Sequence, residues 1–204
     1  MAAAAASAGT EPEVPHKGLI TLSIMLATIM QVLDTTIANV ALPVVIEDLS
    51  LTATEAQWMN AVYSLVFASL LITVGRVGDL RGRRRLFLIG MLVFMTASVF
   101  AGLAVNGPML IAARFVQGIG AAMILPTTLS SLNALFTGRA RVVAFAVYGS
   151  AIGGMAALGP LIGGWLATDY SWRWAFWLNI PVGLLVVLGI VRALPETRDL
   201  TAAP

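Results

Sequence analysis

Residues 19–43 read LITLSIMLATIMQVLDTTIANVALP. The segment is longer than the roughly 20 apolar residues that an α-helix needs to cross a bilayer. It contains one charged side chain, that of Asp34, although a charge at the bilayer centre costs about 2.5–3.5 kcal/mol on insertion scales. The segment therefore predicts a membrane-spanning helix whose carboxylate is there for a structural or functional reason.

The composition of the whole chain is that of a membrane protein. Hydrophobic residues make up 59% and charged residues 11% of the 204 residues, and the mean hydropathy is +0.91, whereas soluble domains are about 25% charged. Further apolar runs predict an all-α integral membrane protein with a six-transmembrane-helix bundle over residues 19–193. The expected spans are 19–43, 57–75, 86–105, 108–133, 142–167 and 174–191.

Charge in the tails and loops predicts the orientation. If the N-terminus is inside, ten Lys and Arg residues fall on the cytoplasmic side and Arg173 alone on the outer side. The positive-inside rule then places both termini in the cytoplasm. The excess of arginine over lysine and the abundant alanine suggest a GC-rich bacterial genome, so we expect the membrane to be a bacterial inner membrane. Residues 1–18 lack the pattern of a cleaved signal peptide. We expect them to be a disordered cytoplasmic tail, and residues 194–204 a second tail or a linker.

One stripe of the first span is small and polar. Its members recur at spacings of three and four residues and so share a helix face: Ser23, Ala27, Gln31, Asp34, Ala38 and Ala41. Because aliphatic residues occupy a separate stripe, we expect Asp34 to face the protein interior. There it either binds and releases protons, as buried membrane carboxylates often do, or only holds a neighbouring helix by hydrogen bonds.

Arg114 is the one cation deep inside a predicted span. It lies in LIAARFVQGIGAA, residues 110–122, and shares a face with Gln117 and Gly118, where small residues permit close helix contact. At 1.5 Å per residue, Asp34 lies about 14 Å and Arg114 about 9 Å below the outer ends of their helices. The two charges are therefore at similar depth, but the spacing leaves their contact open. Arg114 is alternatively a hub for backbone carbonyls.

Two further segments combine glycine with polar or basic residues. GRVGDLRGRRR, residues 75–85, predicts a tight turn whose arginines anchor the inner leaflet and whose acid, Asp79, pairs with a base or caps a helix. GSAIGGMAALGPLIGG, residues 149–164, predicts close helix packing. Pro160 should bend this helix. A packing contact without a role in transport also accounts for the glycines.

Several kinds of chemistry are excluded by residue content. The chain has no cysteine and a single histidine, His16 in the tail, so disulfides and thiolate metal sites are absent. The sequence has no GxxxxGK[ST] loop for ATP, and the spans offer no nucleophile–base set. We therefore expect a protein that is not an enzyme, with no metal, no organic cofactor and no nucleic-acid partner.

Five segments together resemble the major facilitator superfamily, specifically the 14-helix drug:proton antiporters of the EmrB/QacA type. The segments are LDTTIANVALP (33–43), GRVGDLRGRRR (75–85), LIAARFVQGIGAA (110–122), GPLIGG (159–164) and WRWAFWLNIPVG (172–183). Val77 and Leu80 depart mildly from the loop signature, and Met155 stands where the antiporter signature has glycine.

The resemblance implies two inverted three-helix repeats, alternating access and a proton gradient as the energy source. Asp34 would be a protonation or substrate-cation site, with Arg114 adjusting its affinity for protons. The other residues implied for coupling or the substrate cavity are Gln31, Asn39 and Gln117. A conformational latch would be formed by Gly75, Asp79, Gly82, Arg83 and Arg84. Leakage would be limited by Gly159, Pro160, Gly163 and Gly164.

The resemblance also implies partners. Family members are about twice as long, so we expect an N-terminal half that works in the lipid bilayer with a C-terminal half and exports drug-like, hydrophobic or cationic molecules. A complete chain that dimerises is the alternative assembly. The alternative functions are a non-transporting six-helix partner or regulatory protein, and a uniporter or symporter on the same fold.

Overall fold

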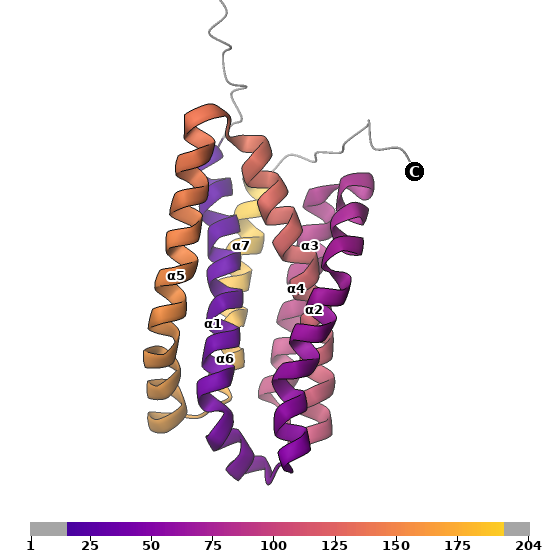
Figure 1. Ribbon diagram of the computed structural model, residues 1–204, viewed down its shortest axis with the longest axis vertical. Coiled ribbons are helices and arrows are strands. Elements are labelled where there is room, and N and C mark those ends of the chain that lie inside the picture. Colours follow the sequence, from indigo (N-terminus) through magenta and orange to yellow (C-terminus); the bar gives the residue numbers. More distant parts are fainter. Residues whose placement is uncertain (1–15, 194–204) are drawn as a thin grey trace, which may run out of the picture.

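The computed structural model describes residues 16–193, apart from the side chains of Asp79 and Arg81. The expectations for residues 1–15 and 194–204 thus lie outside the described residues. Within this range the chain is all helical and has no strand, which confirms the predicted fold class (Figure 1). The helices are α1 (Lys17–Leu49), α2 (Ala53–Arg81), α3 (Arg83–Gly102), α4 (Gly107–Leu135), α5 (Gly138–Asp169), α6 (Trp174–Trp177) and α7 (Asn179–Ala193).

Six helical segments are long and apolar enough to cross a membrane, with α6 and α7 together forming the sixth. Most run past the predicted spans. The first was expected to end at Pro43, yet α1 continues to Leu49 with this proline inside it, because membrane helices tolerate proline where their neighbours compensate. Helix α2 begins earlier than predicted because Thr52 and Glu55 form a reciprocal capping box at its first turn.

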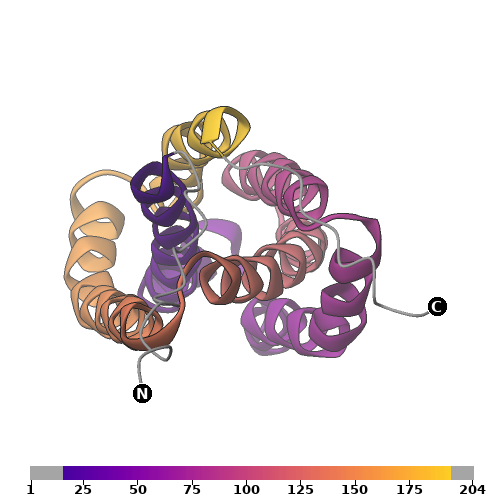
Figure 2. The same ribbon diagram turned by 90° about the horizontal axis from the view of Figure 1, so that it is seen from above.

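The helices pack in a reciprocal pattern. Helix α1 packs mainly on α5 and α7, whereas α4 packs mainly on α2 and α3. Figure 2 shows the bundle end-on, with α1, α5 and α7 on one side, α2 and α3 on the other, and α4 in the middle. If α1–α3 and α4 to α6/α7 are two repeats, each first helix contacts the second and third helices of the other repeat. This exchange is the arrangement expected of two inverted three-helix repeats.

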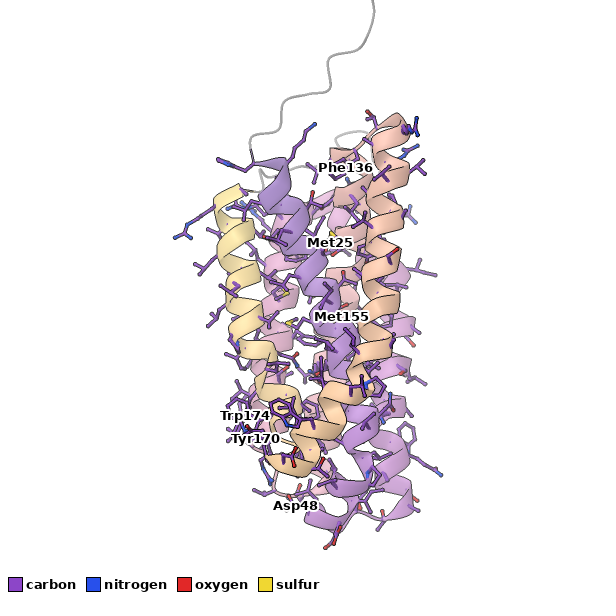
Figure 3. The ribbon with its side chains drawn as sticks, turned by 90° about the vertical axis from the view of Figure 1, so that its left-hand side faces the viewer. Met25, Asp48, Phe136, Met155, Tyr170 and Trp174 are labelled. Atoms are coloured by element: carbon purple, nitrogen blue, oxygen red, sulfur yellow. The ribbon has the colours of Figure 1, made fainter. Side chains whose placement is uncertain are left out.

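The two end faces of the bundle differ. Helix α1 begins and α7 ends at one face, and the opposite face carries a polar cluster (Figures 1 and 3). Asp48 at the end of α1 accepts hydrogen bonds from Trp172 Nε1 and Arg173 Nη1, both at 2.9 Å. Arg173 Nη2 also donates to the Ala104 carbonyl after α3 at 3.2 Å. The cluster therefore joins both repeats at this face.

Helices α3 and α4 touch through glycine. A Cβ atom built on Gly120 would lie 2.7 Å from the Phe94 backbone nitrogen and 2.9 Å from the Gly90 carbonyl oxygen. Atoms of the backbone cannot move aside as the end of a flexible side chain does. Only glycine therefore fits this crossing of α3 and α4, which positions the polar residues described below.

We expect Gly120→Ala to lower the free energy of unfolding by about 1–3 kcal/mol, the usual cost of overpacking a core. Gly149→Ala is the matched control, because a Cβ there meets nothing within 4 Å, and removing a helical glycine stabilises by about 0.5–1 kcal/mol. Thermal unfolding in detergent micelles measures both. Equal melting temperatures for the two variants would contradict the close crossing.

Candidate functional site

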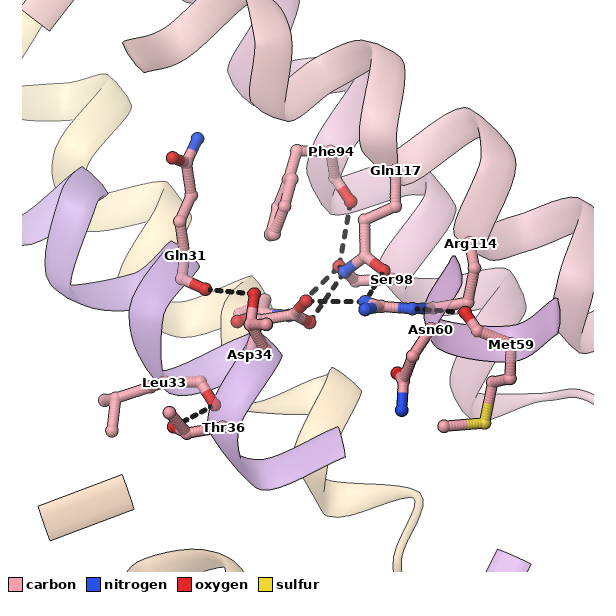
Figure 4. Close-up of polar contacts among 12 residues, drawn as sticks. Gln31, Leu33, Asp34, Thr36, Met59, Asn60, Phe94, Ser98, Arg114 and Gln117 are labelled. Carbon is pink, nitrogen blue, oxygen red and sulfur yellow. Dashed lines mark hydrogen bonds and ion pairs between the residues drawn. The ribbon is translucent and has the colours of Figure 1, made fainter. Parts of the chain in front are cut away.

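The site is centred on an ion pair buried between α1 and α4. Arg114 Nη1 lies 2.6 Å from Asp34 Oδ2, and both side chains have an exposed fraction of 0%. The six residues of the small and polar stripe of α1 are all buried, so Asp34 faces inward as the spacing predicts. Figure 4 shows the carboxylate pointing across the bundle toward α4.

Two amide side chains complete the shell of the carboxylate. Gln117 Nε2 and Asn179 Nδ2 each donate to Asp34 Oδ1 at 2.7 Å. Both nitrogens also donate to Ser98 Oγ, at 2.8 and 3.2 Å, and the Ser98 hydroxyl donates in turn to the Phe94 carbonyl at 2.8 Å. The carboxylate thus receives donors from α4 and α7, arranged around a hydroxyl of α3.

Arg114 makes further contacts that hold it in place. Its Nη1 also donates to Gln117 Oε1 at 2.7 Å, and its Nε donates to the Met59 carbonyl of α2 at 3.4 Å. The guanidinium carbon lies 4.2 Å from the ring centre of Tyr63, within cation–π range. Arg114 therefore binds one backbone carbonyl, but its short charged contact is with Asp34, so it is more than a carbonyl hub.

A groove opens beside this network, between α1, α2, α4 and α5. Its volume is about 430 Å³. No charged side chain is among the described residues that line it, which include Thr28, Gln31, Thr35, Tyr63, Phe67 and Ile152. The Tyr63 and Phe67 rings are stacked with centroids 6.3 Å apart. Since Tyr63 contacts both the groove and Arg114, it lies between the groove and the ion pair.

A family model for the Major Facilitator Superfamily matches residues 24–204. The chain belongs to the Major Facilitator Superfamily. It is 45% identical over 176 residues to the puromycin resistance protein pur8 of Streptomyces alboniger, which covers 86% of this chain and 35% of that protein. It is 38% identical over 193 residues to the multidrug efflux pump LfrA of Mycolicibacterium smegmatis, which covers 93% of this chain and 38% of the pump.

Solved structures agree with this assignment at the level of the fold. The peptide transporter POT in complex with alafosfalin superposes with a TM-score of 0.75 at 18% identity, over 86% of this chain and 38% of that one. The chain spans about a third of the length of the two curated relatives above. The family match and the six membrane-crossing segments make the chain a multi-pass membrane protein of a superfamily of transporters, which are not enzymes. The predicted family and the predicted class of protein are both confirmed.

Two of the residues predicted for coupling, Gln31 and Asn39, lie outside the shell of groups around the Asp34 carboxylate. Gln31 lines the groove, and its Nε2 is 3.5 Å from the Ala121 carbonyl oxygen. Asn39 is exposed, and its Oδ1 accepts a hydrogen bond from Asn60 Nδ2 at 2.8 Å. Asn39 belongs to a separate polar pair between α1 and α2, nearer the end that carries Asp48.

The residues predicted for the superfamily's latch surround the turn between α2 and α3. Gly82 has a φ of 108°, which favours glycine and makes the tight turn possible. Arg83 Nη1 lies 3.5 Å from the Ser130 carbonyl oxygen, and Arg84 Nη2 donates to the Val191 carbonyl at 3.0 Å. Gly75 lies beside Pro126 of α4. The side chain of Asp79 lies outside the described residues, so its pairing stays a prediction.

The glycine-rich segment of α5 divides into two parts. Gly159 and Gly163 pack against Thr36 and Ile37 of α1, and a Cβ on Gly163 would lie 3.0 Å from the Ile37 Cα. A Cβ on Gly164 would lie 3.9 Å from the nearest atom, so this glycine packs less closely. Pro160 is exposed. A Cβ on Gly149, Gly153 or Gly154 would meet nothing within 4 Å. Close packing within the described chain thus involves only the second part.

Two members of the carboxylate shell, Ser98 and Asn179, were not predicted from the sequence. Both are polar residues inside apolar helices, and both are at most 2% exposed. Asn179 lies in the family-like segment 172–183, so its polarity in an apolar span was an available signal. Ser98 carried little signal, because serine often bonds only to its own helix. Among residues 16–193, no group of three His, Cys, Asp or Glu residues could hold a metal ion.

Proposed function

We propose that the chain is the N-terminal six-helix half of a proton-coupled exporter of drug-like molecules. The observation that carries this proposal is the Asp34–Arg114 pair, with both side chains at 0% exposure inside a membrane bundle. Charges in this setting are expensive and are kept mainly for ion pathways or proton relays. Of these two roles, reversible protonation fits a chain whose sequence has no GxxxxGK[ST] loop for ATP.

The proton would act by changing what Asp34 can accept. As an ionised carboxylate it accepts hydrogen bonds at both oxygens. A proton on either oxygen removes the charge that Arg114 balances and puts a donor where donors already point. Protonation therefore favours a different arrangement of α1 against α4. A transporter that alternates between two such arrangements can couple proton entry to substrate exit.

The groove supports the proposed substrate class. Its aromatic and aliphatic lining with a few hydroxyl and amide groups is typical of sites for apolar, drug-sized ligands. The names of the relatives, a puromycin resistance protein and a multidrug efflux pump, point to the same class. The exposed first part of α5 would face the C-terminal half, which would close the groove into a cavity in the inner membrane. Both termini would be cytoplasmic, with the Asp48 cluster outside.

The proposal is tested in everted membrane vesicles that contain the whole transporter. A pH gradient with the vesicle interior acidic should drive accumulation of tetraphenylphosphonium, a hydrophobic cation, as protons leave. A gradient of one pH unit supplies about 1.4 kcal/mol per proton, or about tenfold in the concentration ratio. Collapsing the gradient with a protonophore should abolish accumulation. Movement that is insensitive to the gradient would indicate a uniporter, and no movement at all would indicate a non-transporting partner.

A further inference from the structure

Asn179 occupies a special position in the sixth span. Helix α6 ends at Trp177 and α7 begins at Asn179, and Leu178 between them keeps helical dihedral angles (φ −58°, ψ −29°), so the two helices continue as one span. Pro181 follows two residues later and has no N–H to donate to the Trp177 carbonyl. The Trp177 carbonyl thus lacks its helical donor, and helices bend most readily at such a point. Asn179, the residue that begins α7 at this junction, also donates to the buried carboxylate of Asp34, at 2.7 Å.

Protonation of Asp34 affects its two amide partners differently. Gln117 cannot reverse its amide, because its Oε1 accepts from Arg114 Nη1 and a reversed amide would bring two donors together. Both hydrogen bonds that the described part of the chain gives the Asn179 side chain come from Nδ2. Asn179 is thus the amide that can turn and present its oxygen to a protonated Asp34.

We propose that Asn179 is a positioning residue that transmits the protonation state of Asp34 to the junction of α6 and α7, which Pro181 weakens. With Asp34 ionised, the Asn179 amide nitrogen bridges Asp34 and Ser98 and holds the start of α7 against α1 and α3. With Asp34 protonated, the amide turns, its nitrogen no longer donates to Ser98, and α6 becomes free to bend where Pro181 leaves the Trp177 carbonyl without its helical donor. The inference rests on the proposed role of Asp34 as the proton carrier.

Few other ionisable groups face Asp34. Among the described residues, Arg114 of α4 is the charged group in contact with it, and Tyr63 of α2 packs on Arg114. The contacts from α3 and α7 come from the neutral side chains of Ser98 and Asn179, and Phe176 of α6 lies 5.8 Å from the Arg114 guanidinium. The contact from α7 is thus a neutral amide, which responds to the proton on Asp34 through hydrogen bonding alone.

The first test follows side-chain amides by NMR. The chain is labelled with ¹⁵N-asparagine in lipid nanodiscs and titrated with acid, while infrared spectroscopy follows the carboxyl of Asp34. Five asparagines give few signals, and Asn133, which bonds to Arg141 at 3.0 Å, is the internal reference. We expect the Asn179 signal to shift together with the infrared band, and to stay fixed in Asp34→Asn.

The second test asks whether the signal reaches α6. The indole Nε1 of Trp177 packs against Gly102 of α3, so movement of α6 should shift its ¹⁵N resonance. We expect this pH-dependent shift to disappear in Asn179→Ala. It should persist in Asn106→Ala, a matched control that removes a purely structural cap, the bond from the Met109 nitrogen to Asn106 Oδ1 at 2.9 Å.

The outcomes separate this inference from the proposed function. If the infrared band of Asp34 titrates while the Asn179 signal of the unmodified chain stays fixed, the inference is wrong and the proton site stands. If neither changes between alkaline and acidic buffer, both are wrong. The measurement on Asn179 in the unmodified chain decides the matter even where Asn179→Ala folds poorly.

Discussion

Arg114→Leu is expected to lower the free energy of unfolding by about 3–5 kcal/mol, the usual result of removing one partner of a buried ion pair. The reason is that Asp34 has no exposed surface and would lose its only charged partner among the described residues. The Met59 carbonyl and the Tyr63 ring would lose their contacts with the guanidinium as well. Chemical unfolding in mixed micelles, followed by circular dichroism, measures the change.

The control for this result is the double variant Arg114→Leu with Asp34→Asn. Removing both charges leaves no unpaired ion in the core, and replacing a buried pair by neutral groups is often close to neutral for stability. We therefore expect the double variant to recover most of the loss. If the double variant is as unstable as Arg114→Leu alone, the loss comes from packing around Arg114 and the ion pair is not its cause.

Asp34→Asn is expected to abolish proton-driven efflux by the whole transporter while it remains in the membrane. Asparagine fills nearly the same volume and can still hydrogen-bond, but it cannot exchange a proton in the physiological range. Without an exchangeable proton, the pH gradient cannot drive substrate export. The substrate concentration ratio of about ten per pH unit is then lost. Cells that express the variant should be as sensitive to a hydrophobic cation such as tetraphenylphosphonium as cells without the transporter.

Asp34→Glu is the matched control for that loss. Glutamate keeps an ionisable group but is one methylene longer in a fully packed site, so efflux should be reduced and still depend on the gradient. Immunoblots of membrane fractions verify that the amounts of the variants are equal. Undiminished efflux by Asp34→Asn would exclude Asp34 as the coupling site.

The sequence allowed the centre of the site to be predicted because helical periodicity and depth are local properties. The spacing of the stripe through Asp34 indicated which face of α1 is buried, and counting residues from the helix ends put Asp34 and Arg114 at similar depth. Their contact depends on how α1 and α4 cross. That crossing depends on how each helix packs on its other neighbours, such as α4 on α2 through Gly118 and the Tyr63 backbone, which no single helix specifies.

Other features depend on partners that are distant in the sequence. Ser98 and Asn179 join the network only because α3 and α7 meet α1 and α4 at one level, so their types alone could not reveal the carboxylate shell. The glycine-rich segment 149–164 of α5 was expected to pack closely against another helix. Only Gly159 and Gly163 do so within the described chain, because α5 lies at the edge of the bundle and packs on α1 with its second part.

Infrared difference spectroscopy of the whole transporter in bilayers tests most directly whether Asp34 carries the exchanged proton. The measured quantity is the C=O stretch of a protonated carboxyl, in acidic against alkaline buffer and with or without tetraphenylphosphonium. We predict a band that is absent from Asp34→Asn and that weakens when tetraphenylphosphonium binds the unmodified protein. Identical spectra from the unmodified protein and Asp34→Asn would contradict the account.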